Sequence, residues 1–349
     1  MEQQSRREFI RSCLYLAVSG MAGCCIRRPL DAAALEAPAA DGMSAGYEPP
    51  YIQLHRNGEL KKRGETLWNM MRQCSLCPRE CGARRLDGER GFCQASAQLE
   101  IASYNPHFGE EKPLVGVGGS GTIFFANCAL RCVFCINWQV SHEGAGSPRS
   151  IPDLAGMMLK LQDMGCHNVN VVTPTHYSPH ILLALDQAAA GGLKLPLVYN
   201  TCGWERLEIL KMLDGVADIY LPDFKYSAGD MAAKYSAGAA EYPEVTMAAL
   251  KEMHRQVGVA RPGRDGLVRR GLMIRHLVMP NNVGGSKQVF EWIAQNLPKD
   301  TYVNVMSQYT PYYKAFEYPE ISRRITRREY DDAVRWAKEA GLSNLDIQG

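Results

Sequence analysis

Three cysteines in one short loop offer the clearest chemistry in the chain. Cys128, Cys132 and Cys135 have the spacing Cys-x3-Cys-x2-Cys and directly follow the apolar, aromatic-rich run 122–127, which is typical of a buried strand. Thiolates at this spacing can bind three irons of a [4Fe-4S] cluster and leave the fourth iron open for a small ligand. An open metal position favours chemistry over a structural role. A zinc site with a distant fourth ligand and unligated buried cysteines are the alternatives.

A second group of four cysteines lies earlier in the chain. Cys74, Cys77, Cys81 and Cys93 have the spacing Cys-x2-Cys-x3-Cys-x11-Cys, which supplies enough thiolates to close a tetrahedral site without another ligand. A closed site indicates a structural role or a role in electron relay. Zinc, an auxiliary iron–sulfur cluster, two disulfides formed in an oxidising compartment and unpaired thiols all remain open at this point.

The three-cysteine motif, with Phe134 just before its last cysteine, resembles the signature of the radical S-adenosylmethionine (radical SAM) superfamily. The resemblance implies that Cys128, Cys132 and Cys135 bind a [4Fe-4S] cluster whose open iron chelates S-adenosylmethionine (SAM). An electron from the cluster would cleave SAM, and the resulting 5′-deoxyadenosyl radical would abstract hydrogen from a substrate. Phe134 would pack on the adenine, although a plain core position is the simpler interpretation.

Apolar runs alternate with amphipathic stretches along the rest of the chain. Strands are expected at residues 122–127, 169–173, 196–200, 218–222, 273–278 and 302–306. Helices are expected at residues 152–164, 179–190, 204–213, 243–257, 286–296 and 326–340. This alternation predicts an α/β fold and matches the partial (β/α)6 TIM-like barrel of radical SAM enzymes, here with an N-terminal Cys-rich segment. Function should gather at the C-terminal ends of the strands, where polar residues are indeed found.

Most of the chain, from Cys74 to about Tyr313, resembles the pyruvate formate-lyase activating enzymes, a glycyl-radical-enzyme activase branch. The segments that carry this resemblance are Cys-x2-Cys-Pro at residues 74–78 and the stretches 88–93, 137–138, 173–176, 199–201, 221–226 and 275–280. It implies hydrogen abstraction from a protein or peptide substrate and a need for a low-potential electron donor.

The resemblance also implies which side chains contact SAM. That family usually ends its second strand in Gly-Gly-Glu, which holds the SAM amino group, whereas this chain has Thr173-Pro174-Thr175-His176 there. Thr173, Thr175, their backbone carbonyls or His176 would then make that contact. Asp223 and Lys225 match the family's Asp-x-Lys and would contact SAM or the substrate, with a surface ion pair as the alternative. Asn200 and His276 are expected at the ribose and the methionyl carboxylate, unless His276 is an ordinary core histidine.

The N-terminus resembles an export signal. Ser5-Arg6-Arg7-Glu8-Phe9 matches the twin-arginine pattern, so residues 1–28 are expected to be a signal peptide and residues 29–50 a flexible linker. Residues 51–115 would form the four-cysteine segment and residues 116–349 the barrel core. The expected location is exported or periplasmic, with Cys24 a candidate for lipidation; a cytoplasmic enzyme with a frayed basic terminus is the alternative.

The amino-acid composition excludes several classes of protein. Hydrophobic residues at 46% and charged residues at 22% exclude wholesale disorder and a multi-span membrane protein, and no integral membrane span is expected. The formal net charge of +2 is too small to suggest nucleic acid as a partner. Two other functions compete with the enzyme: an exported, non-catalytic iron–sulfur redox relay on the same barrel, and a zinc-stabilised binding module.

Overall fold

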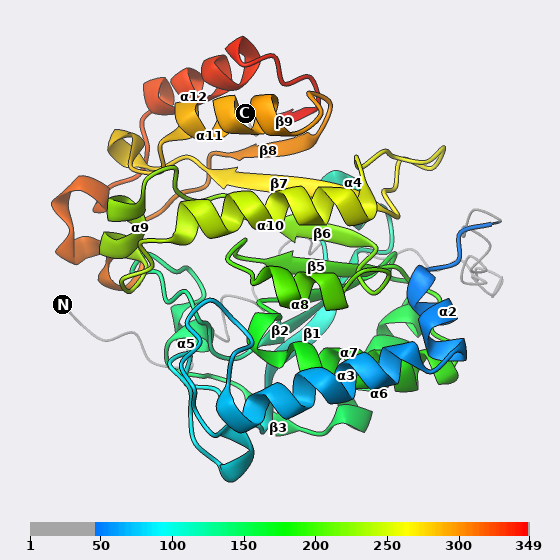
Figure 1. Ribbon diagram of the computed structural model, residues 1–349. Coiled ribbons are helices and arrows are strands. Elements are labelled where there is room, and N and C mark those ends of the chain that lie inside the picture. Colours follow the sequence, from blue (N-terminus) through cyan, green and yellow to red (C-terminus); the bar gives the residue numbers. More distant parts are fainter. Residues whose placement is uncertain (1–45, 348–349) are drawn as a thin grey trace, which may run out of the picture. The chain divides into compact units, whose positions relative to one another are not determined.

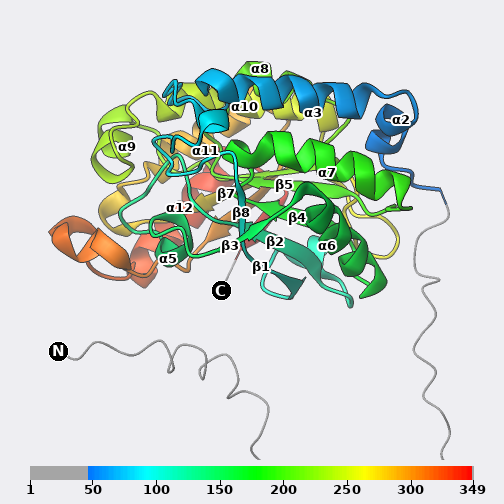
Figure 2. The same ribbon diagram turned by 90° about the horizontal axis from the view of Figure 1, so that it is seen from below.

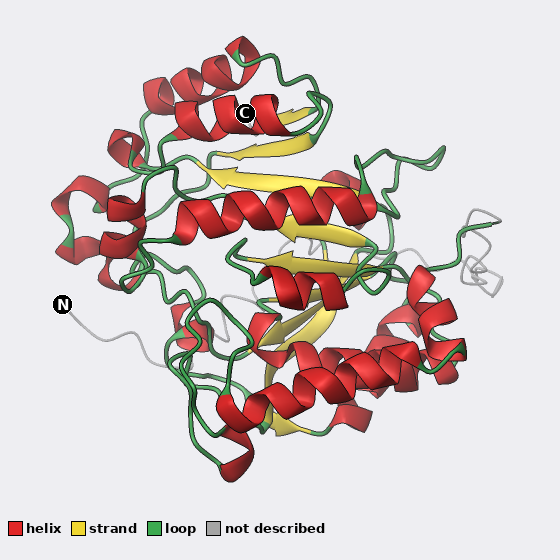
Figure 3. Cartoon of the chain, in the orientation of Figure 1, coloured by secondary structure: helices red, strands yellow, loops and turns green. Residues whose placement is uncertain are grey.

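The six predicted strands are all present in the computed structural model, which describes residues 46–347. They are β2 (Ser120–Phe125), β4 (Val169–Val172), β5 (Leu197–Thr201), β6 (Ile219–Pro222), β7 (Gly271–Leu277) and β8 (Tyr302–Met306). Each pairs in parallel with the next, as the arrows in Figures 1 and 3 show. Within residues 46–347 the strand order runs from β3 to β9, and these two edges do not pair with each other. The predicted α/β class and open, partial barrel are confirmed.

Three further strands were not predicted: β1 (Leu99–His107), β3 (Ser147–Arg149) and β9 (Leu345–Ile347). β1 pairs antiparallel with both β2 and β3, and its register shifts between Ile101 and Ser103. β3 and β9 are three residues long, too short to show a periodic pattern. β1 lies in the expected N-terminal segment yet is hydrogen-bonded to the expected core, and all described residues belong to one compact unit.

The helices of the β/α units lie close to their expected positions. They are α6 (Ile151–Asp163), α7 (Ser178–Ala190), α8 (Leu207–Met212), α10 (Tyr242–Val257), α11 (Ser286–Asn296) and α12 (Arg327–Glu339). Capping boxes begin two of them, through Ser150 with Asp153 and Thr326 with Glu329. Short or N-terminal helices were not predicted: α2 (Pro50–Arg56), α3 (Glu59–Asn69), α4 (Lys112–Val115), α5 (Trp138–Ser141) and α9 (Gly229–Tyr235). Figure 2 shows α3 running along α7, farther from the sheet than α7 is.

Helix α4 packs against the face of the sheet that the main helices do not cover. Its Leu114 joins a small apolar cluster with Val198, Ile219 and Met273, separate from the main core. Side chains alternate between the faces of a strand, so these residues face away from the neighbours Tyr199 and Tyr220, which belong to the main core. Through α4 the chain also brings Glu110 and Glu111 to this inner face.

The predicted signal peptide, most of the linker and Cys24 lie outside the described residues. Among residues 46–347, no helix combines the length and the apolar character that crossing a membrane requires.

Candidate functional site

The three-cysteine loop begins directly after β2. Asn127 and Arg131 have left-handed backbone conformations, with φ of 74° and 51°. Asn127 tolerates this conformation better than most residues. Its side chain donates a hydrogen bond to Glu100 Oε2 at 2.9 Å, and its backbone nitrogen donates to the Val140 carbonyl at 2.8 Å. These contacts turn the loop back over the C-terminal end of the strand.

Two serine hydroxyls donate to the thiols of this loop. Ser236 Oγ lies 3.1 Å from Cys132 Sγ, and Ser141 Oγ lies 3.2 Å from Cys135 Sγ. Burial raises the pKa of Cys132 to about 12, while the positive charge of Lys225 and the hydroxyl of Ser236 act in the opposite direction. The loop therefore supplies a buried thiol together with groups that stabilise its thiolate.

Segments far along the chain hold the loop in place. The Val133 backbone nitrogen donates to the Tyr235 carbonyl, and the Val133 carbonyl accepts from the Lys314 nitrogen, both at 2.9 Å. Phe134 is buried between Tyr226 and Tyr309, with ring centroids 6.4 and 5.9 Å away. Its contact with an adenine stays a prediction.

The donor set of this loop fits an iron–sulfur cluster. Within residues 46–347 no three His, Cys, Asp or Glu side chains are arranged around a single metal ion. A [4Fe-4S] cluster needs no such cage, because each thiolate binds a different iron. Arg131 directly precedes Cys132 in the chain, and its Nη1 is buried without a hydrogen-bond partner among the described residues, which suits a negatively charged group nearby.

A network of charged side chains occupies the inner face of the sheet. Asp223 accepts from Lys225 Nζ at 2.6 Å and from Arg275 Nε at 2.8 Å, and Arg275 Nη2 donates to Asn200 Oδ1 at 2.7 Å. Burial alone would raise the pKa of Asp223, but Arg275 and Lys225 hold it below its usual range. Three of the predicted site residues, Asn200, Asp223 and Lys225, are thus brought together near the cysteine loop.

Arg275 and Glu110 complete this network and were not predicted. Arg275 Nη1 lies 3.6 Å from Glu110 Oε2. Burial raises the pKa of Glu110 to about 7, with Arg275 opposing and Glu111 adding to the shift. The alternation of strand β7 predicts that Arg275 and His276 face opposite sides of the sheet but not which of them faces inward. Nothing local in the sequence indicates that the segment before α4 reaches the inner face.

His276 is not brought to this network, which corrects the expectation for that residue. It follows Arg275 on β7 and therefore faces the opposite side of the sheet. Its Nδ1 bonds the Phe224 carbonyl at 2.7 Å, its Nε2 bonds Ser286 Oγ at 2.9 Å, and its ring packs on Phe290 of α11. His276 is a fully bonded core histidine.

The segment after β4 is also turned mostly into the core. Thr175 donates to Glu205 Oε1 at 2.6 Å, and the His176 ring bonds the Ala126 carbonyl at 2.8 Å; both residues are buried. This corrects the expectation that their side chains face a ligand. Thr173 alone stays partly exposed, at the tip of the strand, with an unusual left-handed φ of 58°.

The four-cysteine segment packs against the same ends of the strands. Cys74, Cys77 and Cys93 are buried and Cys81 is exposed, and all nine cysteines in the described residues are free of disulfides. Arg206, after β5, donates to the Ser75 carbonyl at 2.6 Å and forms an ion pair with Glu80.

Arg79 joins the two cysteine groups. It lies between Cys77 and Cys81 in the sequence, and its guanidinium donates to the Ala129 and Ser236 carbonyls, both at 3.2 Å. The rings of Phe92 and Trp204 lie 4.1 and 4.7 Å from the guanidinium carbon. Burial lowers the pKa of Arg79, and charge on Cys77, Glu241, Cys128 or Cys132 would act in the opposite direction. One cation therefore faces thiols of both groups.

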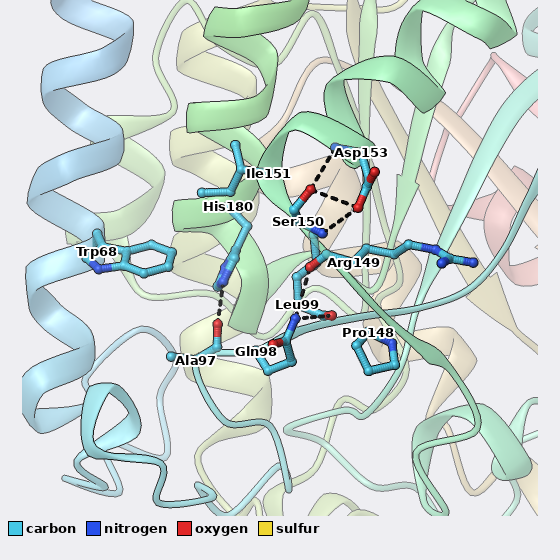
Figure 4. A pocket seen from close by; sticks show the side chains of 10 residues that line it. All are labelled: Trp68, Ala97, Gln98, Leu99, Pro148, Arg149, Ser150, Ile151, Asp153 and His180. Atoms are coloured by element: carbon cyan, nitrogen blue, oxygen red, sulfur yellow. Dashed lines mark hydrogen bonds between the residues drawn. The ribbon is translucent and has the colours of Figure 1, made fainter.

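A hollow of about 520 Å³ lies elsewhere, between α3, α7 and the start of α6. Figure 4 shows His180 beside Trp68, with its ring bonded to the Ala97 carbonyl, and the capping box of Ser150 and Asp153 on the other wall. None of the residues that line it is a cysteine. The two cysteine groups lie at the ends of the strands instead.

Comparison with known proteins gives one clear relative. No protein-family model matches the chain. The uncharacterized protein MJ0674 of Methanocaldococcus jannaschii is 33% identical over 298 residues, which cover 82% of this chain and 80% of that protein.

Solved structures align more distantly. SuiB of Streptococcus suis, in a crystal structure bound to S-adenosylmethionine, aligns with a TM-score of 0.43 at 13% identity, over 64% of this chain and about half (48%) of SuiB. A radical SAM methyltransferase from Sphaerobacter thermophilus aligns with a TM-score of 0.42 at 10% identity, over 85% of this chain and 91% of that one.

Proposed function

The chain belongs to the same family as MJ0674, and we propose that it is a radical SAM enzyme that abstracts hydrogen from a protein or peptide substrate. The observation that carries the proposal is the loop after β2, where Cys128, Cys132 and Cys135 lie with hydroxyl donors and cations around their thiols. Cys128, Cys132 and Cys135 would hold a [4Fe-4S] cluster at this place, and that cluster would supply the low-potential electron for reductive cleavage of SAM.

The residues around the loop prepare this site before any ligand binds. Ser236 and Ser141 donate to the thiols, which favours their deprotonation in a buried place. Lys225 keeps its charge although burial disfavours it, because Asp223 pairs with it and holds its pKa above the usual range. Asp223, Lys225 and Arg275 then offer one anion and two cations toward the amino and carboxylate groups of SAM or of a substrate backbone.

Apolar surface beside the loop supports a macromolecular substrate. Ile136, Tyr312 and Phe316 are exposed, at 61%, 38% and 65%. Their chain segments are tied together through the bond between Val133 and Lys314. Exposed apolar groups that gather at one place often mark the binding site of a protein partner. The motifs shared with pyruvate formate-lyase activating enzymes support a peptide backbone as hydrogen donor, with a low-potential electron donor as the second partner.

The test is anaerobic reconstitution followed by an assay for 5′-deoxyadenosine with SAM and dithionite. The wild type should form the nucleoside, and Cys132→Ser should lose it together with the iron of this site. Cys166→Ser, at a buried cysteine outside both groups, is the matched control and should behave as the wild type. Iron without SAM cleavage would refute the enzyme and favour a redox relay.

Export belongs to the proposal as well, since residues 1–28 resemble a twin-arginine signal. Fractionation of cells that produce the full chain should find the wild type outside the cytoplasm and Arg6→Lys/Arg7→Lys inside. Equal cytoplasmic retention of both would favour the cytoplasmic alternative.

A further inference from the structure

Arg85 is a fully buried cation without a carboxylate partner. It begins the short helix η2 (Arg85–Asp87), and none of its side-chain surface reaches solvent. Its guanidinium donates to the Ser96 carbonyl at 2.7 Å, to the His176 carbonyl at 2.8 Å and to Cys74 Sγ at 3.8 Å. No acidic residue in the described range forms an ion pair with it. The adjacent Arg84, by contrast, is exposed and paired with Glu89.

A buried charge of this kind needs a counter-ion. Carbonyl oxygens satisfy the hydrogen bonds of a guanidinium but do not neutralise its charge, and buried charges in proteins are as a rule paired or close to bound metal centres. Glu100, which approaches the same Tyr177 ring that Arg85 faces, is paired with Arg90 at 3.3 Å instead. The remaining ionisable groups around Arg85 are His176, His180, Tyr177 and the cysteines, and of these only the cysteines become anions by binding a metal.

The thiols near Arg85 are close neighbours of one another. A Cβ atom placed on Gly91 would lie 3.2 Å from Cys81 Sγ and 3.6 Å from Cys93 Sγ, so the two sulfurs flank a position that only glycine fills without contact. Burial raises the pKa of Cys93; Arg85 lowers it again, whereas Cys74 and Cys81 add to the rise. Burial likewise raises the pKa of Cys77, and charge on Cys93, Cys74 or Cys81 would raise it further.

Backbone hydrogen bonds fold the segments that carry these thiols into tight turns. The Cys74 nitrogen donates to the Ala83 carbonyl and the Cys74 carbonyl accepts from Gly82, both at 3.0 Å, with Gly82 at a left-handed φ of 66°. The Gly91 nitrogen donates to the Ala95 carbonyl at 3.0 Å, which closes the turn that carries Cys93. Both turns bring thiols from separate parts of the segment to one place.

We propose that Cys74, Cys77, Cys81 and Cys93 hold a [4Fe-4S] cluster whose net negative charge is the counter-ion of Arg85. When the four thiols take up a preassembled [4Fe-4S]²⁺ cluster, they release four protons to water and four sulfur–iron bonds form, with no change in oxidation state. Four thiolates leave a net charge of about −2 on a [4Fe-4S]²⁺ cluster, in which each thiolate binds a different iron. A single Zn²⁺ does not fit, because no three metal-binding side chains within residues 46–347 surround one ion. The proposal is independent of radical chemistry at Cys128, Cys132 and Cys135.

The first test counts metal in a full-length chain without the other site. Cys128→Ser/Cys132→Ser/Cys135→Ser is purified anaerobically and reconstituted with iron and sulfide or with zinc. About four irons and four sulfides per chain support the cluster, whereas about one tightly bound zinc without a stable iron–sulfur cluster overturns it. Metal no higher than in a variant that also carries Cys77→Ser/Cys93→Ser overturns the proposal, and so does a disulfide among the four cysteines.

The second test asks whether Arg85 senses the charge of the centre. Arg85→Met in that background should lose metal to a chelator about ten- to a hundredfold faster, the usual effect of removing a group that supports metal ligands. In the metal-free protein the same change should raise the unfolding midpoint, because it removes an unpaired buried charge. Arg84→Met should change neither quantity. A variant that unfolds at a lower midpoint both with and without metal, at an unchanged rate of metal loss, would show that Arg85 only packs.

Discussion

Ser236 donates its hydroxyl to Cys132 Sγ at 3.1 Å although the two residues are 104 positions apart in the chain. Ser236 follows α9, on the connection between β6 and α10, whereas Cys132 belongs to the loop after β2. The same Ser236 hydroxyl lies 2.9 Å from the hydroxyl of Tyr226. The environment of the first thiol group therefore depends on a segment that carries no cysteine.

Replacing Ser236 by Ala should shift the reduction potential of the bound cluster to a more negative value. Hydrogen bonds to the sulfurs stabilise the reduced, more negatively charged state, so their loss disfavours reduction. A redox titration followed by electron paramagnetic resonance measures this shift. Ser322→Ala, at an exposed hydroxyl bonded only to the Pro319 carbonyl, is the control. An unchanged potential in Ser236→Ala would mean that the hydroxyl does not contact a ligand sulfur in the loaded protein.

Replacing Arg79 by Lys should weaken both cysteine groups at once. Lysine cannot donate to the Ala129 and Ser236 carbonyls together while its charge lies between the rings of Phe92 and Trp204. We expect a loss of about 2 kcal/mol in the free energy of unfolding, the magnitude of one hydrogen bond made by a charged group. Chemical denaturation measures it, with exposed Arg72→Lys as the control. A stability equal to that of the control would contradict the role of Arg79 as a link.

Most of the fold could be predicted from the sequence because its strands and helices repeat a strong local pattern. Every strand from β2 to β8 except the three-residue β3 was placed within two or three residues, since each is an apolar run bounded by turn residues. β1 was missed because half of its residues are polar or exposed, so its apolar pattern is weak. Its strand character comes from pairing with β2, which no local signal reports.

The residues of the candidate site also fall into those with a local sequence signal and those without one. The cysteines were identified because their spacing is itself the signal, whereas Arg79, Arg85 and Ser236 have ordinary sequence surroundings. His276 was misjudged because a strand end offers two faces, and the sequence does not say which of Arg275 and His276 points inward. Only the packing of His276 on α11 shows that its side chain lies on the helix-covered face of the sheet.

Glu205 should make stability depend on pH between about 4.5 and 7. Burial raises its pKa from 4.5 to about 7, although Thr175 and Thr201 both donate to its Oε1 and oppose the shift. The folded chain therefore binds this proton more tightly than the unfolded chain. The stabilisation is complete below pH 4.5 and is lost as the pH rises through 7.

Glu205→Gln removes this proton while it keeps an oxygen acceptor for both threonines. Relative to the variant, the wild type should lose on the order of 3 kcal/mol between pH 4.5 and pH 7. Urea denaturation at a series of pH values checks this. Asp218 is also buried, with a pKa raised to about 7, so only the difference between wild type and variant isolates Glu205. A pH-independent difference would show that Glu205 stays ionised in the folded protein.

Thr173→Gly should leave the stability unchanged or raise it by up to about 1 kcal/mol. A β-branched residue in the left-handed conformation is strained, and glycine removes that strain at the cost of a more flexible unfolded chain. Thr66→Gly, on the exposed surface of α3, should instead lower the stability, because glycine is a poor helix former. The thermal unfolding midpoints of both variants, compared with that of the wild type, test this prediction. Equal destabilisation would mean that Thr173 has compensating contacts.

The hydrogen bonds that hold Val133 can form only late in the synthesis of the chain. Val133 is fixed by Tyr235 on one side and by Lys314 on the other, and Lys314 is added to the growing chain about 180 residues later. At roughly 5–20 residues per second this delay is about ten to forty seconds. For most of that interval the three thiols of the loop are outside the ribosome without their final supports. Iron should therefore enter this loop only after translation is nearly complete, and a ribosome stalled before residue 314 should carry a nascent chain whose first thiol group is still empty.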